Sequence, residues 1–282
     1  MRWKGQRKSS NVEYSRGGRV ARGGAKMGIG TIVIVMVISF VTGKNPLSLL
    51  QMVGGSQQGV TTQQTTNAPK SAYEKELEDF SVTILASTED AWNAEFKRLG
   101  SKYPVPKMKI FSGNVSTACG VNSEATGPFY CPGDQKVYLA LSFFNQLKRM
   151  GAPGDFAQAY VIAHEVGHHI QNVTGTEKKM RQMQQRDPRN AKKYSVMLEL
   201  QADCYAGVWA ALAEKQRKWL EAGDVEEGLQ AAASIGDDTL QRNAGRRVDV
   251  ESFTHGSSKQ RIYWLKKGMS TGDISQCDTF NQ

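Results

Sequence analysis

The chain has 282 residues, of which 39% are hydrophobic and 22% are charged, a composition that excludes a fully disordered protein and a polytopic membrane protein. Its formal net charge is +9, but residues 1–26 contain eight of the 36 Lys and Arg residues and only one acidic residue, Glu13. The rest of the chain is therefore almost neutral, with 28 basic residues against 26 acidic ones. This balance argues against a broad surface that binds nucleic acid.

Residues 27–43 carry no charge, and this length is close to the minimum that crosses the ~30 Å hydrocarbon core of a bilayer. A cleaved signal peptide would need a cleavage site of small residues, but no alanine lies between Ala25 and Ala68. We therefore predict an uncleaved, single-pass transmembrane anchor over residues 27–43. Because Lys and Arg stay in the cytoplasm, residues 1–26 are expected to form a basic cytoplasmic tail.

The same rule places everything after the anchor outside the cytoplasmic membrane of a bacterium, in the periplasm or the extracellular space. Residues 44–71 are rich in Gln, Thr, Ser and Gly, a composition that cannot bury a core and predicts a flexible linker. Residues 72–282 are long enough for one domain. We expect an α+β domain that is dominated by helices and contains a small sheet.

Hydrophobic periodicity gives the expected elements of this domain in chain order. The Thr88-Glu89-Asp90 sequence is typical of a helix start, and Asp155 with Gln158 predicts an N-cap pair. A loop rich in Gly and Ser separates the two expected strands. The expected helices are Ser71–Phe80, Ser87–Leu99, Ser142–Met150, Asp155–Asn172, Tyr194–Lys218, Val225–Arg242 and Ser258–Lys267, and the expected strands are Lys107–Phe111 and Lys136–Ala140.

The most informative segment contains His164, Glu165 and His168 in a His-Glu-x-x-His arrangement. On a helix, His164 and His168 are one turn apart on the same face, where both imidazoles can bind a single ion. Glu165 points away from this pair, so it is not expected to be a ligand, but it can reach a metal-bound water as a general base. The alternative is a pair of histidines with ordinary hydrogen bonds.

A catalytic zinc site needs a third protein ligand and an open fourth position for water. Gln171 and Thr174 stand where a metzincin would have a glycine and a third histidine, which excludes that class. Glu199 and Asp203 lie downstream, one helical turn apart. We predict Glu199 as the third zinc ligand and Asp203 as the acceptor for the second ring N–H of a ligating histidine. The alternative is a pair of exposed acids on an amphipathic helix.

The chain contains two further histidines. His169 directly follows the predicted ligand pair but faces another side, so we expect a core histidine with a backbone partner rather than a direct role. His255 precedes Gly256, which suggests a tight loop. It is a catalytic candidate, because it could donate a hydrogen bond to the oxyanion of a tetrahedral intermediate, and a purely structural role is the alternative.

The spacing of the four cysteines fits no metal-binding knuckle. Cys119 and Cys131 flank one loop and are expected to form a disulfide across it. A second bridge, between Cys204 and Cys277, would tie the C-terminal segment to the helix that carries Glu199. Free buried thiols are the alternative, which the expected oxidising compartment disfavours.

At this point the sequence resembles the bacterial neutral zinc metallopeptidases, a family of small membrane-anchored proteins, over nearly its whole length. The resemblance implies a zincin-like α+β fold in which His164, His168 and Glu199 bind zinc and Glu165 is catalytic. The chain departs from the family pattern at Ala140, where an acid is usual, so its handling of substrate could differ. The segments that carry the resemblance are Met1–Gly5, Ser10–Glu13, Gly127–Pro132, Ala163–Gln171, Glu199–Trp209, Ile235–Asp238 and Phe253–Gly256.

The sequence therefore predicts a membrane-anchored zinc peptidase, most simply an endopeptidase, that acts on a protein or peptide substrate and binds no nucleic acid. We expect the strand Lys136–Ala140 to be an exposed edge that pairs with an extended substrate. The alternative is a non-proteolytic envelope scaffold or adaptor that keeps zinc for structure. The presence of Glu165 disfavours this alternative, because a structural zinc site needs no general base and closes its fourth position.

Overall fold

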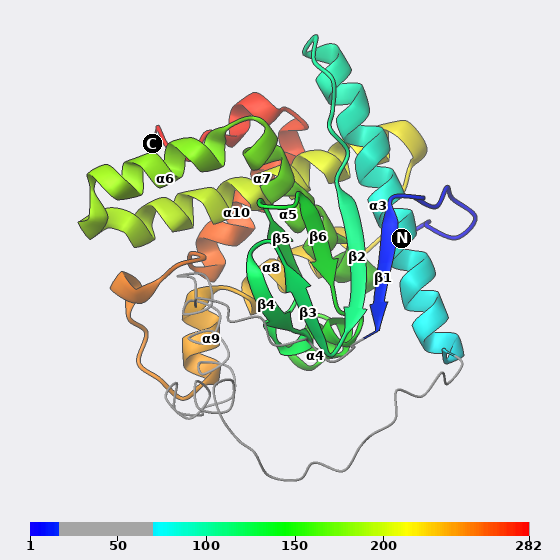
Figure 1. Cartoon of the computed structure of the whole chain (residues 1–282), viewed down its shortest axis with the longest axis horizontal. Helices are drawn as coiled ribbons and strands as arrows, with labels where there is room; N and C mark the ends of the chain where they lie inside the picture. Colours follow the sequence, from blue (N-terminus) through cyan, green and yellow to red (C-terminus); the bar gives the residue numbers. More distant parts are fainter. Residues whose placement is uncertain (17–69, 282) are drawn as a thin grey trace.

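A computed structural model describes residues 1–16 and 70–281 of the chain. Helices dominate this part, and they pack around and beside a small sheet, so the predicted α+β class is confirmed (Figure 1). The helices are α3 (Ala72–Arg98), α4 (Ser142–Arg149), α5 (Asp155–Val173), α6 (Thr176–Arg186), α7 (Ala191–Arg217), α8 (Asp224–Ser234), α9 (Asp237–Asn243) and α10 (Ser258–Thr271). The strands are β1 (Val12–Arg16), β2 (Lys107–Ser112), β3 (Asn114–Thr117), β4 (Gly120–Ser123), β5 (Phe129–Cys131) and β6 (Lys136–Leu139).

The main sheet has the strand order β1-β2-β6-β5, with β1, β2 and β6 parallel and β5 antiparallel to β6. Strands β3 and β4 form a separate antiparallel pair. Both predicted strands are confirmed as β2 and β6, but the prediction that Lys136–Ala140 forms an exposed edge is wrong. Strand β6 lies between β2 and β5, because β1 and β5, which the sequence did not reveal, occupy the two edges.

Helix α3 runs unbroken where two helices were predicted. It begins after the N-cap Ser71, whose side chain forms a capping box with Glu74, and it continues through Thr88, the predicted second start. The Thr88 hydroxyl instead donates to the carbonyl of Leu85 at 2.7 Å, a bond that a Thr can form inside a helix. The local start signal was therefore satisfied without ending the helix.

The remaining helices follow the predictions with three differences. Helix α5 has Gly154 as its N-cap, so Asp155 is its first residue rather than part of a capping pair. The predicted helix Val225–Arg242 is two helices, α8 and α9, which are separated at Ile235 and Gly236. Helix α6 was not predicted; it is strongly polar and only Met180 is buried.

Helix α7 packs against both α5 and α10, and these three helices position most of the site. A glycine in α10 permits the close contact with α7: a Cβ at Gly268 would lie 2.0 Å from the carbonyl oxygen of Cys204. The α5–α7 contact is also close, since a Cβ at Gly167 would lie 3.0 Å from the carbonyl oxygen of Ala202. Large side chains such as Trp209 and Phe156 fill the core beside these contacts.

Both predicted disulfides are present, Cys119–Cys131 and Cys204–Cys277. The first joins the turn between β3 and β4 to strand β5. The second joins the short C-terminal 3-10 helix at Ile274–Cys277 to α7, one residue beyond Asp203.

Residues 1–16 do not form a solvated tail. Strand β1 pairs in parallel with β2, and Trp3 packs edge-on against Phe80 of α3 with 5.2 Å between ring centroids. The folded part that the structure describes therefore includes residues 1–16 as well as residues 70–281. The predicted anchor, 27–43, and nearly all of the predicted linker, 44–71, lie outside the described residues. In the part of the chain that the structure describes, no helix has both the length and the apolar character needed to cross a membrane.

Candidate metal centre and active-site cleft

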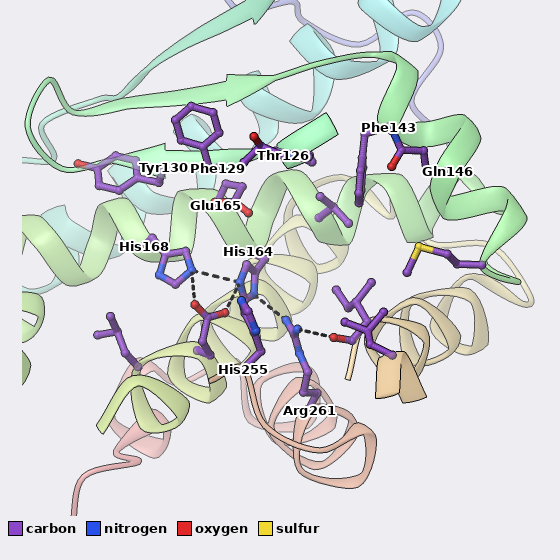
Figure 2. A pocket seen from close by; sticks show the side chains of 18 of the residues that line it. Thr126, Phe129, Tyr130, Phe143, Gln146, His164, Glu165, His168, His255 and Arg261 are labelled. Atoms are coloured by element: carbon purple, nitrogen blue, oxygen red, sulfur yellow. Dashed lines mark hydrogen bonds and ion pairs between the residues drawn. The ribbon is translucent and has the colours of Figure 1, made fainter. Parts of the chain in front are cut away.

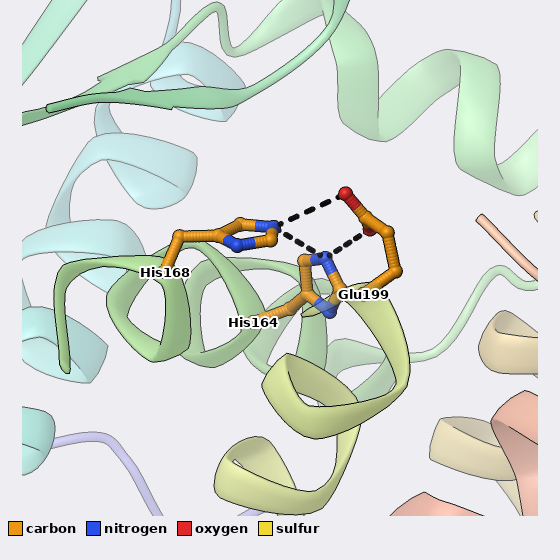
Figure 3. A group of neighbouring side chains, drawn as sticks. All are labelled: His164, His168 and Glu199. Carbon is orange, nitrogen blue, oxygen red and sulfur yellow. Dashed lines mark hydrogen bonds and ion pairs between the residues drawn. The ribbon is translucent and has the colours of Figure 1, made fainter. Parts of the chain in front are cut away.

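The structure brings together the three predicted ligands, His164 and His168 of α5 and Glu199 of α7 (Figure 3). The Nε2 atoms of the two imidazoles are 3.2 Å apart. The Glu199 carboxylate lies 3.2 Å from Nε2 of His164 and 3.5 Å from Nε2 of His168. Three donor atoms thus form a compact triangle at the junction of the two helices.

This donor set fits zinc in both chemistry and spacing. Two imidazoles and one carboxylate are a usual set of protein ligands for a catalytic zinc ion. With metal–ligand distances of about 2.0–2.2 Å, two donors in a tetrahedral site are about 3.3–3.6 Å apart. The separations of 3.2 to 3.5 Å match this value closely. Three protein donors also leave a fourth position for water or substrate.

Asp203 is where the sequence predicted it, behind His164, and it is fully buried. Its Oδ1 lies 2.8 Å from Nδ1 of His164, which leaves Nε2 of that ring toward the metal centre. Two residues that were not predicted complete this network: Tyr160 donates to Asp203 at 2.6 Å, and Arg261 of α10 donates to both carboxylate oxygens at 2.9 Å.

The network controls the charges around the metal centre. Burial alone would raise the pKa of Asp203, but Arg261 and His164 outweigh it and lower that pKa. Burial alone would lower the pKa of His164, whereas Asp203 and Glu199 raise it to about 10. The carboxylates beside the two imidazoles favour a cation at this point, and a bound metal ion would replace the protons of the imidazoles.

His168 is held by a different group. The Oε1 of Gln171 lies 2.9 Å from its Nδ1, and the Gln171 amide donates to the carbonyl of Leu198 at 2.6 Å. Gln171 also lies 3.2 Å from Gln201, which in turn donates to the carbonyl of Cys277. The orientation of His168 is therefore linked to α7 and, through Gln201, to the C-terminal segment that the second disulfide fixes.

His255 approaches the centre from the loop between α9 and α10 and lines the same cleft (Figure 2). Its loop is built around Asp237, whose Oδ2 accepts three backbone N–H bonds, from residues 254, 255 and 256, at 2.7 to 3.0 Å. Asp237 Oδ1 lies 3.2 Å from Nδ1 of His255. Burial would lower the pKa of His255, but Glu199 and Asp237 raise it. The ring is thus a positioned, partly buried donor beside the ligands.

Glu165 lies beside the metal centre and is not a member of the ligand triangle, as predicted. Its side chain lines a cleft of about 740 Å³ that also includes the three ligands and His255. Figure 2 shows Phe129 and Tyr130 of β5 along one wall of this cleft and Phe143 and Gln146 of α4 at one end. Within the described residues, no hydrogen-bond donor holds the Glu165 carboxylate, so it is available to a molecule in the cleft.

The other predicted positions also have clear locations. His169 is fully buried on another side of α5, between the carbonyl of Pro104 and the Tyr130 hydroxyl, which confirms the expected core histidine with a backbone partner. Ala140 is buried in a small apolar cluster and does not line the cleft.

A second group of acids lies at the start of α5, formed by Asp155, Asp224 and Glu227. It already has a cationic partner, because the α-ammonium group of Met1 lies 3.1 Å from both oxygens of Asp155 and 3.3 Å from Asp224. Among the described residues, the histidine–glutamate triangle is therefore the better metal site.

The sequence analysis missed Tyr160 and Arg261, and a sequence pattern could have identified only the first of them. Tyr160 precedes His164 by four residues, so helical spacing alone places it on the ligand face. Arg261 lies 58 residues beyond Asp203 and is brought to it only by the α7–α10 contact, so no local pattern marks it.

Comparison with known proteins gives a family match over nearly the whole chain. Residues 1–280 match the model of a family described as "Putative neutral zinc metallopeptidase". The chain is 45% identical over 293 aligned residues to the uncharacterized protein YpfJ of Escherichia coli (strain K12), covering 100% of this chain and 99% of that protein. It is 41% identical over 208 residues to the uncharacterized protein Rv2575 of Mycobacterium tuberculosis, covering 70% of each. No solved structure matches the chain.

Proposed function

Because the chain belongs to this neutral zinc metallopeptidase family, we propose that it hydrolyses peptide bonds with one zinc ion held by His164, His168 and Glu199. One observation carries the proposal. Three side chains of the kinds that bind zinc form a triangle at the wall of a cleft, and Glu165, which is outside this triangle, lines the same cleft. In this proposal the domain is zincin-like and the enzyme is an endopeptidase.

When bound, zinc would supply a Lewis acid that activates water and polarises the scissile carbonyl. Glu165 accepts a proton from the attacking water and passes it to the leaving amine. His255, which Asp237 orients through its Nδ1, donates a hydrogen bond to the negative oxygen that develops on the carbonyl. Asp203 and Gln171 keep the two imidazoles in the required orientation.

The cleft suits an extended peptide. Strand β5 is an edge of the main sheet, and its residues Phe129 and Tyr130 line the cleft. An extended substrate can add to such an edge through main-chain hydrogen bonds, which recognise a peptide whatever its side chains are. We therefore assign to β5 the substrate-pairing role that the sequence suggested for Lys136–Ala140.

We further propose that the domain functions outside the cytoplasm, attached to the bacterial membrane. The two disulfides support this location, because such bonds persist in oxidising compartments and are rare in the cytosol.

The experiment that tests the function uses the full chain with Glu165→Gln as its main variant. The substitution keeps the size of the side chain and removes the group that accepts the proton. We expect zinc content and melting temperature to stay near those of the unmodified chain, while cleavage of an unfolded protein falls by roughly 10²–10⁴-fold. A chelator should abolish cleavage by the unmodified chain, and added zinc should restore it.

Two outcomes would change the conclusion. If Glu165→Gln cleaves as well as the unmodified chain, another group is the general base. If both forms hold zinc and neither cleaves any peptide in a diverse mixture, the domain is the non-proteolytic scaffold.

A further inference from the structure

Residues 1–16 are built into the domain along their whole length. Five residue pairs join β1 to β2, from Val12 opposite Met108 to Arg16 opposite Ser112. Nearer the N-terminus, backbone N–H groups bond to distant carbonyls, Ser9 to Val82 at 3.0 Å and Arg2 to Trp219 at 2.9 Å. This segment contacts α3, β2 and the loop after α7, so it is part of the folded structure.

A buried carboxylate in α3 depends on the same segment. Glu89 is 4% exposed, and its side chain accepts from Ser9 at 2.5 Å, Asn11 at 2.9 Å and Arg7 at 2.9 Å. All three donors belong to the N-terminal segment. A carboxylate that is buried without hydrogen-bond donors costs a large free energy. The burial of Glu89 in α3 therefore requires residues 7–11 to be packed against this helix.

The two flanks of residues 17–69 also meet. The ammonium group of Lys70, just before α3, lies 4.7 Å from the ring centroid of Tyr14 in β1. The described residues on either side of 17–69 thus lie at the same strand, with Arg16 at the end of β1 and Lys70 beside Tyr14.

From this packing we infer that residues 1–16 and residues 70–281 lie on the same side of the membrane. A single crossing by residues 27–43 would place β1 and β2 in different compartments, where their pairing is impossible. A shared side excludes the topology that the basic residues suggested, in which the chain crosses the membrane once, with its N-terminus inside and its domain outside.

Cysteine labelling of the full chain tests the inference. The four native cysteines are in disulfides, so a single new thiol reports its own compartment. Lys8→Cys lies in the N-terminal segment, where the Lys8 side chain is 53% exposed, and Lys266→Cys lies on the exposed side of α10. With a membrane-impermeant maleimide on spheroplasts, we expect both thiols to be labelled to the same extent before permeabilisation.

The outcomes separate this inference from the proposed location. Labelling of Lys266→Cys but not Lys8→Cys before permeabilisation would overturn the inference. Labelling of both only after permeabilisation would support the shared side and contradict the export of the domain. Neither result depends on peptidase activity, so a failure of the proposed function leaves this test unaffected.

Adjacent serines give a second test that depends on packing alone. Ser9 donates to buried Glu89, whereas its neighbour Ser10 is exposed. We expect Ser9→Ala to lower the melting temperature of the full chain by several degrees and Ser10→Ala to leave it nearly unchanged. In a Glu89→Gln background the effect of Ser9→Ala should shrink, because the two groups form one contact. Equal melting temperatures for the two serine variants would contradict the inference.

Discussion

Two faces of helix α5 place the same residue type in opposite surroundings. On the cleft face, His164 and His168 lie beside the carboxylates of Glu199 and Asp203. On the sheet face, His169 lies between a backbone carbonyl and the Tyr130 hydroxyl, with no carboxylate against it among the described residues.

The pKa values follow these surroundings. Carboxylates outweigh burial on the cleft face and raise the pKa of His164 to about 10, whereas burial dominates on the sheet face and lowers the pKa of His169 to about 4. The cleft face therefore favours a cation, either a proton or a metal ion, and the sheet face favours a neutral ring that is part of the core. The position of each histidine relative to the carboxylates thus separates the two candidate zinc ligands from the core histidine.

The largest expected effect comes from removing a zinc ligand. His164→Ala or Glu199→Ala should reduce zinc from one ion per chain to almost none, because two remaining protein ligands hold zinc poorly. His169→Gln, which changes the other face of the same helix, should retain one zinc. Elemental analysis of the purified full-length variants checks both results. Retention of a full zinc ion by His164→Ala would break the comparison.

The next effect concerns pH, and it belongs to the sheet face. The pKa of His169 is about 4 in the folded state, below its ordinary value of 6.5. The unfolded chain therefore binds more protons between these values, so the contribution of His169 is fully present above pH 6.5 and is lost as pH falls toward 4. The lost stability is roughly 3 kcal/mol.

Melting temperatures between pH 7 and pH 4 measure this contribution. The fall on acidification should be shallower for His169→Gln, which cannot titrate, than for the unmodified chain. Parallel curves for the two proteins would show that folding leaves the pKa of His169 unshifted, which would contradict the difference between the two faces of α5.

The smallest of the three effects comes from Asp203, the residue that orients His164 on the cleft face of α5. Asp203→Asn keeps the side-chain size but removes the charge behind His164, and it should weaken zinc binding by about 10–100-fold. Asp237→Asn, which alters the partner of His255 instead of a ligand's partner, should leave zinc affinity unchanged. Competition with a chelating dye measures both affinities, each corrected for the folded fraction. Equal affinities for the two variants would show that Asp203 does not orient the ligand.

The metal centre could be predicted from the sequence because its parts are local. His164 and His168 are four residues apart, and so are Glu199 and Asp203, so helical periodicity alone places each pair on a common face, with Glu165 next to the first pair. Arg261 could not be predicted in this way, because only the packing of α10 on α7 brings it to Asp203.

The fold shows the same division. Helices α4, α5, α7 and α10 were predicted close to their observed bounds, since their apolar residues repeat at helical spacing. Strand β1 was missed because its pairing with β2 joins residues almost a hundred positions apart. Its basic surroundings indicated a tail, although Arg7 in that segment forms ion pairs with Glu89 and Asp90 of α3.

The central claim is that zinc binds at the junction of α5 and α7, and anomalous diffraction tests it most directly. Crystals of the zinc-loaded full chain, measured on both sides of the zinc absorption edge, should show one strong peak within about 2.0–2.2 Å of His164 Nε2, His168 Nε2 and a Glu199 carboxylate oxygen. A peak among Asp155, Asp224 and Glu227 with none between the two histidines would contradict the claim.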